Sequence, residues 1–290
     1  MRSLNSIKNI ATGIFLQIIT ILLGFISRSI FINKIGIEML GMNGLLSNVL
    51  SMLSLVELGI GSAILYSLYK PLTQKNENQI KAIMNLYSKL YKYIGIAVAV
   101  VGLCIMPFIK YITGEDISGS YVSKVYLIFL ANSVLSYFLS YRRNILSADQ
   151  QSFILNKLSA VFSIMTTVIQ IIIISLIKNY ILYLIINLVL SFTENLVVYF
   201  ITNKKYPYLK TKYSEPLDTN IKNEIIKNAK AIFIVKIAVY FVYGTDNMLL
   251  SSFCGIAIVG IYSNYNMLIS TINSFISQIF NGITASFGNF

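Results

Sequence analysis

The sequence predicts an all-α membrane protein with eight spanning helices, arranged as a six-helix lobe followed by two further helices. Three observations lead to this fold class: the composition, the spacing of apolar runs and the distribution of basic residues. Of the 290 residues, 56% are hydrophobic and 12% are charged, and the mean hydropathy is +0.71. Ordinary soluble domains carry about 25% charged residues. The chain is therefore expected to lie in a lipid bilayer.

Apolar runs recur along the chain, each close to the length of about 20 residues that a helix needs to cross the hydrocarbon core. The first run follows Arg2 and Lys8, as in a signal peptide, but it is too long and lacks a small-residue cleavage pattern. We expect it to be retained as the first spanning helix. The eight runs cover residues 10–32, 41–67, 93–113, 122–141, 154–177, 181–202, 231–253 and 256–281.

Basic residues gather on one side of this predicted bundle. With a cytoplasmic N-terminus, 17 of the 23 lysines and arginines fall in cytoplasmic segments, as the positive-inside bias requires. Four others would lie outside, and the last two, Arg28 and Lys236, fall within helices. The net charge of +12 then follows from the topology and attracts membrane lipids. We expect a multi-pass protein of the cytoplasmic membrane, without a nucleic-acid partner.

Two charged segments, residues 68–92 and 203–230, interrupt the apolar pattern. In the second, apolar residues recur at helical spacing between lysines, which predicts an amphipathic helix at the membrane interface. These residues are Ile221, Ile225, Ala229 and Ile232. The sequence is thereby divided into an N-terminal six-helix lobe (1–203), a basic cytoplasmic linker with the amphipathic helix (204–230), and the first two helices of a second lobe (231–290).

A weak internal repeat relates the last two helices to the first two. An offset of 219 residues, without gaps, aligns the helix ends and the short turn between the helices. It pairs Asn9 with Asn228, Gln17 with Lys236, Ser27 with Asp246, Arg28 with Asn247, Gly36 with Gly255, Gly41 with Gly260, and Ser51 with Ser270. Copies separated by an even number of helices share one orientation, so we expect an axis along the membrane normal. The first and seventh helices would then face each other across a central cleft.

Ionisable residues within the apolar runs mark candidate functional positions. A charge near the bilayer centre costs about 2.5–3.5 kcal/mol on insertion scales, so it usually faces a bundle interior or a wet cavity. Snorkelling of Arg28 to the membrane surface and structural pairing of Glu194 are the alternatives. The five residues are Arg28, Glu57, Glu194, Lys236 and Asp246.

Polar and small residues form a stripe on three of the predicted helices, at the spacing of one helix face. Close helix packing alone can explain a stripe of small residues. Because each stripe also carries a charge, a hydrated cavity is the favoured interpretation. The stripes are Gly13, Gln17, Thr20, Gly24 and Arg28; Asn43, Ser47, Ser54, Glu57 and Gly61; and Lys236, Tyr240, Tyr243 and Asn247, with Asp246 beside them.

The composition also limits the chemistry that the chain can perform. It contains no histidine, the most common metal ligand and general base in proteins. Its two cysteines, Cys104 and Cys254, lie far apart in apolar sequence. We therefore expect no disulfide, no metal site and no cofactor. The short predicted outer loops further argue against a membrane enzyme such as a polymerase or an acyltransferase.

Two segments resemble a known family. They are LSLVELGIGSAILYSLYKPL at 53–72 and TDNMLLSSFCGIAIVGIYSNYNMLIS at 245–270. They are similar to helices of bacterial polysaccharide transporters, the Wzx-type flippases of O-antigen and capsule repeat units. That family belongs to the multidrug/oligosaccharidyl-lipid/polysaccharide (MOP) exporter superfamily. The resemblance covers essentially the whole chain and implies a MATE-like bundle, in which two six-helix lobes enclose a V-shaped cavity.

The resemblance also implies a function and partners. A protein of this kind moves undecaprenyl-pyrophosphate-linked oligosaccharides across the bacterial cytoplasmic membrane by alternating access. Its partners would be the lipid-linked oligosaccharide, membrane lipids and other polysaccharide assembly proteins. Because the chain supplies only two helices of the second lobe, we expect a C-terminally truncated protein or one that a second chain completes.

The candidate residues suit such a substrate. Arginine offers bidentate donors and lysine a compact charge, so we hypothesise that Arg28 and Lys236 contact the pyrophosphate. Glu57 and Asp246 are expected either to bind a coupling cation or to neutralise these two bases. Polar residues of the stripes can bind sugar hydroxyls, namely Gln17, Asn43, Tyr240 and Asn247.

Two other interpretations remain open. A cation-coupled multidrug exporter of the MATE type would share the fold, but we expect it to favour acidic or aromatic cleft residues over arginine and lysine. The chain could also be an inactive truncated remnant. Drug-resistance profiling of a deletion strain distinguishes the exporter from the flippase.

Overall fold

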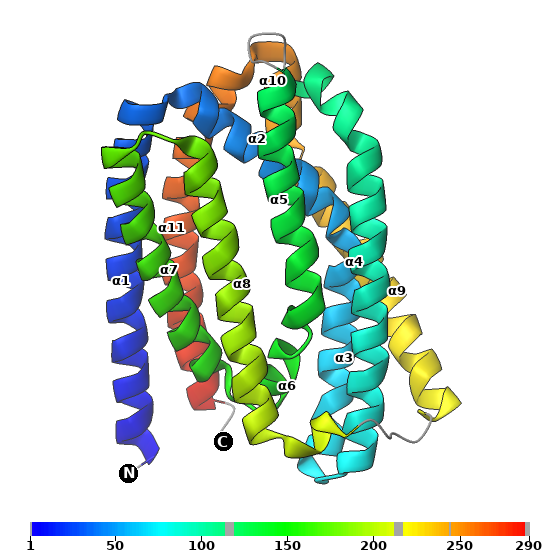
Figure 1. Cartoon of the computed structure of the whole chain (residues 1–290). Helices are drawn as coiled ribbons and strands as arrows, with labels where there is room; N and C mark the ends of the chain where they lie inside the picture. The colour runs from blue at the N-terminus through cyan, green and yellow to red at the C-terminus, as the bar shows by residue number, and fades with distance from the viewer. Residues whose placement is uncertain (1, 114–118, 212–216, 244, 288–290) are drawn as a thin grey trace.

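All regular secondary structure in the described part of the chain is helical. The computed structural model describes residues 2–113, 119–211, 217–243 and 245–287 (Figure 1). This confirms the prediction of an all-α fold. The elements are α1 (Arg2–Ile35), α2 (Ile37–Leu53), α3 (Leu55–Thr73), α4 (Glu77–Thr113), α5 (Gly119–Ser140), α6 (Arg143–Ala148), α7 (Ser152–Leu176), α8 (Tyr180–Lys205), the 3-10 helix η1 (Pro207–Lys210), α9 (Thr219–Tyr243), α10 (Asp246–Cys254) and α11 (Ile256–Phe287).

Five helices are long and apolar enough to cross a membrane, counted over the residues that the structure describes. They are α1, α4, α5, α7 and α8, and each includes one predicted apolar run to within one residue at its end. Two other predicted spans are each divided in two: run 41–67 into α2 and α3, and run 231–253 between α9 and α10. The last predicted run lies in α11. The chain is thus a multi-pass membrane protein, and its second and seventh predicted spans are each divided between two helices.

Ser54, at the break between α2 and α3, is hydrogen-bonded both to the preceding turn of α2 and to a different helix. The hydroxyl of Ser54 donates to the carbonyl oxygen of Leu50, 3.0 Å away, and accepts a hydrogen bond from Tyr137 at 2.7 Å. A serine that bonds back to the preceding turn bends a helix. Helix α2 consequently runs obliquely across one end of the bundle, whereas α3 runs along its length (Figure 1).

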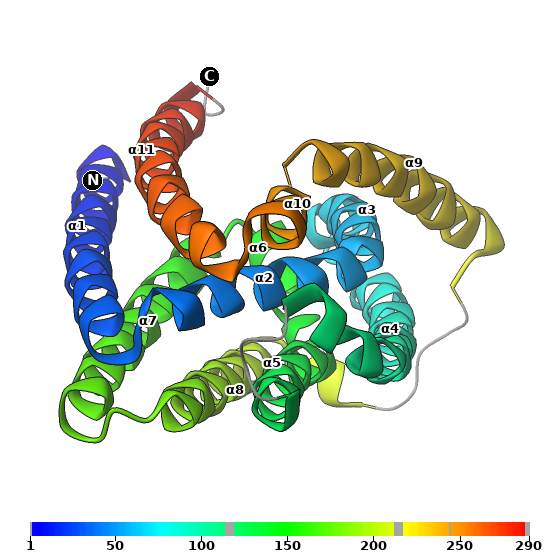
Figure 2. The ribbon, with the colours of Figure 1, turned by 90° about the horizontal axis from the view of Figure 1, so that it is seen from above.

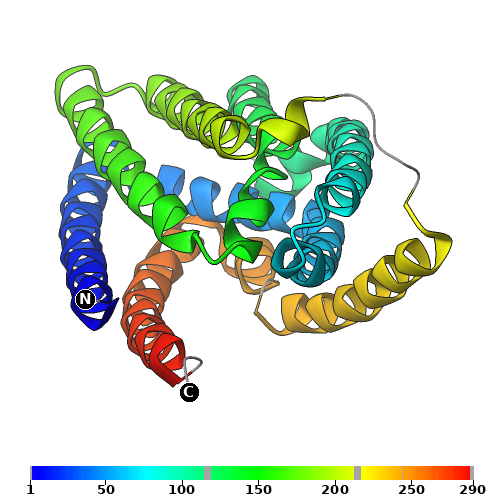
Figure 3. The same ribbon diagram turned by 90° about the horizontal axis from the view of Figure 1, so that it is seen from below.

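The first eight α-helices form the N-terminal part of the bundle. Helix α1 packs against α7, α7 against α8, α8 against α5, α5 against α4, and α4 against α3. Helix α2 lies across the middle of this arrangement, with α5 on one side and α10 and α11 on the other (Figures 2 and 3). The last helices therefore pack mainly against α2 and α3 of this N-terminal part.

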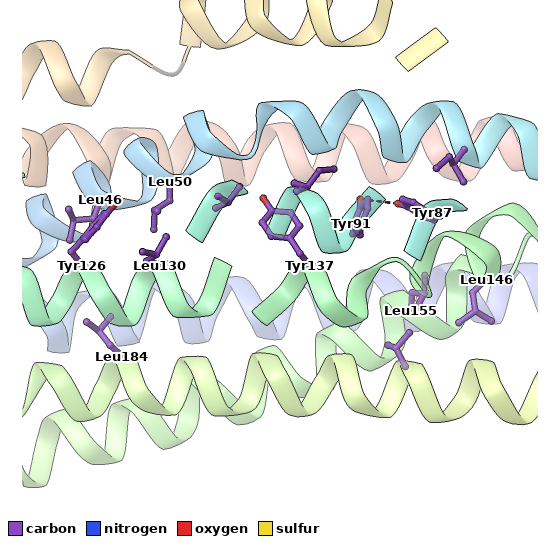
Figure 4. Close-up of a cluster of buried hydrophobic side chains, with 14 of the residues drawn as sticks. Leu46, Leu50, Tyr87, Tyr91, Tyr126, Leu130, Tyr137, Leu146, Leu155 and Leu184 are labelled. Carbon is purple, nitrogen blue, oxygen red and sulfur yellow. Dashed lines mark hydrogen bonds between the residues drawn. The ribbon is translucent and has the colours of Figure 1, made fainter. Parts of the chain in front are cut away.

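The core of the N-terminal lobe contains large buried tyrosines as well as aliphatic side chains (Figure 4). Tyr126 donates from its hydroxyl to the carbonyl oxygen of Gly102 at 2.8 Å. A Cβ at Gly102 would lie 2.4 Å from Leu130, so glycine lets α4 and α5 approach closely. Tyr87 and Tyr137 are likewise buried and hydrogen-bonded. Tyrosine fits such an interior because its apolar ring packs while its hydroxyl finds a partner.

The internal repeat is visible where α2 crosses α11. Gly36 and Gly255, which the 219-residue offset pairs, have φ values of 108° and 85° and directly precede α2 and α11. A Cβ at Gly41 would lie 2.0 Å from the Ile256 carbonyl oxygen. Reciprocally, a Cβ at Gly260 would lie 2.4 Å from the carbonyl oxygen of Ile37. The offset pairs Ile37 with Ile256. The two copies thus meet through equivalent glycines on either side of a pseudo-twofold axis.

The first part of α9 is the segment for which the sequence predicts an amphipathic helix at the membrane interface. In the structure, the apolar face of this segment packs against other helices of the chain. Ile225 is buried, and Ile221, Ala229 and Ile232 pack against the same core. A Cβ at Gly59 of α3 would lie 2.6 Å from the carbonyl oxygen of Ala229. Helix α9 therefore runs closely along α3. It continues without a break from the charged segment into the seventh predicted span.

Candidate functional site

A cavity of about 200 Å³ surrounds Arg28 in the second half of α1. Its walls come from α1, α2, α7, α8 and α11, so it lies between the N-terminal lobe and the last helix. The lining residues are Gly24, Ser27, Arg28, Phe31, Leu40, Asn43, Thr167, Gln170, Tyr183 and Met267. The structure therefore places two of the predicted site residues, Arg28 and Asn43, around one cavity.

Arg28 is held by neutral partners from α11. Its Nε donates to Oδ1 of Asn264 at 2.5 Å, and its Nη2 donates to the hydroxyl of Ser263. Within the described residues, no carboxylate lies at ion-pair distance from the guanidinium. A guanidinium has five N–H donors. Arg28 therefore keeps donors and a full charge for an anion that enters the cavity.

A larger cavity of about 540 Å³ adjoins the first one. The two share Asn43, Gln170 and Tyr183 in their walls. Besides these three, helices α2, α5 and α8 line the larger cavity with Ser47, Leu50, Ser51, Ser54, Phe129, Asn132, Ser133, Leu184 and Asn187. Hydroxyls and amides dominate its polar wall. Such groups bind hydroxyl-rich or otherwise uncharged polar molecules.

Two other predicted residues, Tyr240 and Asn247, approach α2 from α9 and α10. Tyr240 donates to the carbonyl oxygen of Asn48 at 3.0 Å. Asn247 is buried, and its Nδ2 lies 3.4 Å from the position that a Cβ on Gly44 would take. The offset of 219 pairs Arg28 with Asn247 and Ser263 with Gly44. The approach of Asn247 to Gly44 of α2 is therefore the counterpart of the contact between Arg28 and Ser263 of α11. Neither Tyr240 nor Asn247 lines the two cavities.

Gln17 and Lys236 are also separated from the Arg28 cavity. Gln17 donates to the hydroxyl of Ser274 at 3.2 Å and so links α1 to α11 away from the cavity wall. Lys236 is half-buried on α9, the helix that runs along α3, and it lines neither cavity. The structure therefore does not bring Arg28 and Lys236 to one cavity. The side chain of Tyr243, from the same predicted stripe as Lys236, lies outside the described residues.

Glu57 belongs to a chain of tyrosine hydroxyls rather than to the Arg28 cavity. Tyr91 donates to Oε1 of Glu57 at 2.8 Å, and Tyr87 donates to Tyr91 at 2.9 Å. Asn144 of α6 in turn donates to the Tyr87 hydroxyl at 2.5 Å. Tyr137, which donates to Ser54, connects this region to the wall of the larger cavity. The carboxylate thus sits beside the larger cavity but not on its wall.

The other acidic residues of the apolar runs have local partners. Asp246, at the start of α10, accepts a hydrogen bond of 2.5 Å from the Tyr262 hydroxyl on α11. Glu194 pairs with Arg143 at 2.6 Å, which is the structural pairing considered for it. The contacts of Glu57 and Asp246 are therefore to tyrosines and not to the two basic residues, Arg28 and Lys236.

Several wall residues were missed by a search for charged residues. Gln170 of α7 is buried and donates to the Tyr183 carbonyl oxygen at 3.2 Å, and both residues line both cavities. Asn132 and Asn187 are uncharged amides within apolar helices. A scan for amides in predicted spans would have found Asn132, Gln170 and Asn187.

The chain is similar to known proteins in sequence and in fold. Residues 6–284 match the family described as "Polysaccharide biosynthesis protein". A solved structure named "protein A" superimposes with a TM-score of 0.67 and 14% sequence identity over 96% of this chain. The chain spans 62% of the length of that protein, and at such identity the likeness concerns the fold alone. Comparison with curated proteins gives no significant match.

The family match covers nearly every described helix, from the first turns of α1 to the end of α11. It includes the Arg28 cavity and both copies of the repeat. It also confirms the resemblance to polysaccharide transporters that the segments at 53–72 and 245–270 indicated. This multi-pass membrane chain belongs to the polysaccharide biosynthesis protein family.

Proposed function

We propose that this chain forms the substrate-binding part of a transporter that flips undecaprenyl-pyrophosphate-linked oligosaccharides across the bacterial cytoplasmic membrane. The products would be surface polysaccharides such as O-antigen or capsule. The observation that carries the proposal is Arg28, whose guanidinium lines an intramembrane cavity and whose hydrogen-bond partners among the described residues are neutral. An unneutralised cation at such depth is costly and usually marks a path for substrates or ions.

The pyrophosphate would bind at Arg28. The fork of N–H donors on arginine matches a phosphate in a bidentate manner, and each charged hydrogen bond contributes about 1.5–3 kcal/mol. The hydroxyl of Ser263 and the amide of Asn264 would then exchange their bond to Arg28 for bonds to phosphate oxygens. Phosphate binding would thereby change the hydrogen bonds between α1 and α11. Substrate binding would in this way affect how the N-terminal lobe and the last helices are positioned relative to each other.

The position of the lobes supports alternating access as the mode of transport. The crossing of α2 and α11 at Gly41 and Gly260 leaves no room for even a methyl group between the two units. Helices α1 and α11 make far less contact with each other than α3 and α9 do. We infer that the units rock about the α2–α11 crossing, with the N-terminus cytoplasmic as the distribution of basic residues predicts.

Removal of the Arg28 charge tests the proposed function. We expect Arg28→Gln to weaken binding of polyprenyl pyrophosphate to the purified chain in lipid nanodiscs by at least about tenfold, because one charged hydrogen bond is lost. Lys34→Gln, which removes an exposed charge from the end of the same helix, is the matched control and should bind as the wild type. Equal binding by wild type and Arg28→Gln, with unchanged thermal midpoints, would contradict the proposal.

A multidrug exporter is the second candidate, and the same preparation distinguishes it. None of the described residues that line the Arg28 cavity is a carboxylate that could attract organic cations. We therefore expect lipophilic cations not to compete with polyprenyl pyrophosphate. Binding of such cations with no affinity for the pyrophosphate lipid would favour the exporter, and binding of neither class would favour an inactive remnant.

Glu57 is proposed as the group that couples transport to a proton or cation, with Asp246 as the alternative. Glu57→Gln keeps an oxygen that accepts from Tyr91, so we expect the thermal midpoint to change little. The same change removes the charge, and the effect of a pH gradient on transport should disappear. Glu57→Leu, by contrast, leaves the buried Tyr91 hydroxyl without this acceptor and should destabilise the fold by about 1–3 kcal/mol. If the pH gradient still affected transport by Glu57→Gln, Glu57 would not be the coupling group and its role would be structural.

A further inference from the structure

The larger cavity has a polar wall without any charge. None of its lining residues, all within the described part of the chain, is a lysine, arginine, aspartate or glutamate. Its volume of about 540 Å³ lies within the range of about 300–1,000 Å³ that is typical of small-molecule pockets. This contrasts with the adjoining smaller cavity, in which Arg28 supplies a full positive charge.

Three side-chain amides at the wall have capacity for a ligand. Asn43 on α2, Asn132 on α5 and Asn187 on α8 make no side-chain hydrogen bond to any residue that the structure describes. Each amide offers two donors and one acceptor oxygen. Because they come from three helices, their groups surround the cavity rather than form a stripe on one helix.

We infer that the larger cavity is the subsite for the first sugars of the cargo, and that these sugars are uncharged. The inference rests on the proposed function, since it assumes a pyrophosphate at Arg28. Sugar hydroxyls both donate and accept, which matches the amides and serine hydroxyls of the wall. The rings of Phe129 and Tyr183 add apolar surface for the carbon faces of a sugar ring.

The order of the two cavities agrees with the covalent structure of such a cargo. In a lipid-linked oligosaccharide the first sugar is bonded directly to the pyrophosphate, so its subsite must adjoin the phosphate subsite. Asn43, Gln170 and Tyr183 stand in the walls of both cavities and mark this junction. A pyrophosphate at Arg28 therefore directs the first sugar into the larger cavity.

An acidic sugar would be unfavourable in this subsite. A uronic acid carboxylate that enters the cavity loses part of its hydration and gains no cationic partner in return, which disfavours it relative to a neutral sugar. The wall offers it no cation, and Arg28 is already engaged by the pyrophosphate. The chemistry of the wall thus selects neutral hexoses or N-acetylhexosamines over acidic sugars at the reducing end of the repeat unit.

Three matched probes test the inference on the full chain in nanodiscs. They are polyprenyl pyrophosphate, the same lipid carrying a neutral disaccharide, and the same disaccharide with one C6 oxidised to a carboxylate. We expect the neutral glycolipid to bind about tenfold more tightly than the bare lipid, which corresponds to the gain from one or two net hydrogen bonds. The acidic glycolipid should gain nothing over the bare lipid.

A charge introduced at the wall should reverse this preference. Asn187 is exposed at the cavity, so Asn187→Lys adds a cation there without burying it in the core. We expect this variant to bind the acidic glycolipid more tightly than the neutral one. Asn223→Lys, at an exposed position on α9, is the matched control and should keep the wild-type preference. Asn132→Leu should reduce binding of the neutral glycolipid but not of the bare lipid.

The outcomes separate the two proposals. If the bare pyrophosphate lipid does not bind better than the corresponding polyprenol, the proposed function fails. If it binds but the neutral and acidic glycolipids bind equally, or neither exceeds the bare lipid, the neutral sugar subsite is wrong while the function stands. An unchanged preference in Asn187→Lys, with the thermal midpoint of the wild type, would also overturn the subsite.

Discussion

Gly41→Ala is expected to destabilise the fold by about 3 kcal/mol, near the upper end of the usual cost of overpacking. The added Cβ would lie 2.0 Å from the Ile256 carbonyl oxygen and 3.1 Å from the Gly260 nitrogen, both backbone atoms. Neither atom can rotate away, so α2 and α11 must separate. The thermal midpoint of the purified chain in nanodiscs measures the effect. Gly260→Ala, with a Cβ 2.4 Å from the Ile37 carbonyl oxygen, should have a similar effect.

A neighbouring glycine provides the control for this prediction. At Gly44 the nearest atom to an added Cβ is Nδ2 of Asn247, 3.4 Å away at the end of a side chain. Gly44→Ala should therefore be tolerated, because alanine also favours a helix by about 1 kcal/mol over glycine. Once the helices have separated, a second methyl group costs less, so Gly41→Ala/Gly260→Ala should be less than additive. A thermal midpoint of Gly41→Ala equal to that of Gly44→Ala would refute the close crossing.

Glu194→Leu is expected to cost about 3 kcal/mol, because it leaves the guanidinium of Arg143 without its counter-charge inside the bundle. Oε1 of Glu194 accepts from Nη2 of Arg143 and from the hydroxyl of Ser159, each at 2.6 Å. Nε of Arg143 also donates to Asn195 at 3.0 Å. The group joins α6, α7 and α8. Resistance to proteolysis and the thermal midpoint report the loss.

The double substitution shows whether the cost comes from an unpaired charge. Arg143→Leu/Glu194→Leu removes both charges, so we expect it to recover most of the stability that Glu194→Leu loses. The more accessible pair of Lys205 and Asp149, 3.8 Å apart, is the matched control. Lys205→Gln should change stability by less than about 1 kcal/mol. If the double variant were less stable than Glu194→Leu, the charge explanation would be wrong.

The positions of the helices could be predicted from the sequence because transfer of an apolar run into lipid depends on that run alone. Each predicted span corresponds to one helix or to two consecutive helices. The repeat was also detectable, since the chain conformation at Gly36 and Gly255 requires a residue that tolerates positive φ. The breaks were not, because the bend at Ser54 depends on a hydrogen bond from Tyr137 on a different helix.

The composition of the site depended on the tertiary structure. Sequence reasoning selected Arg28 and Asn43 as polar positions on helix faces, and both line one cavity. It expected Arg28 and Lys236 to contact the same pyrophosphate, whereas α9 carries Lys236 along α3, and Lys236 does not line that cavity. The direction in which a helix face points is set by its neighbours, which the periodicity of one helix does not specify.

By itself, the sequence determined that this protein is a helical membrane bundle, that its last helices repeat its first, and that an arginine lies within its first span. Hydropathy and local backbone chemistry act over short stretches of chain, so they can be read from one sequence. Only the tertiary structure decided that Gln170 and Tyr183 line the Arg28 cavity, that Asn187 lines the adjoining larger cavity, and that Glu57 accepts a hydrogen bond from a tyrosine. These residues come together because helices distant in sequence pack side by side, and packing depends on the shapes of all of them at once.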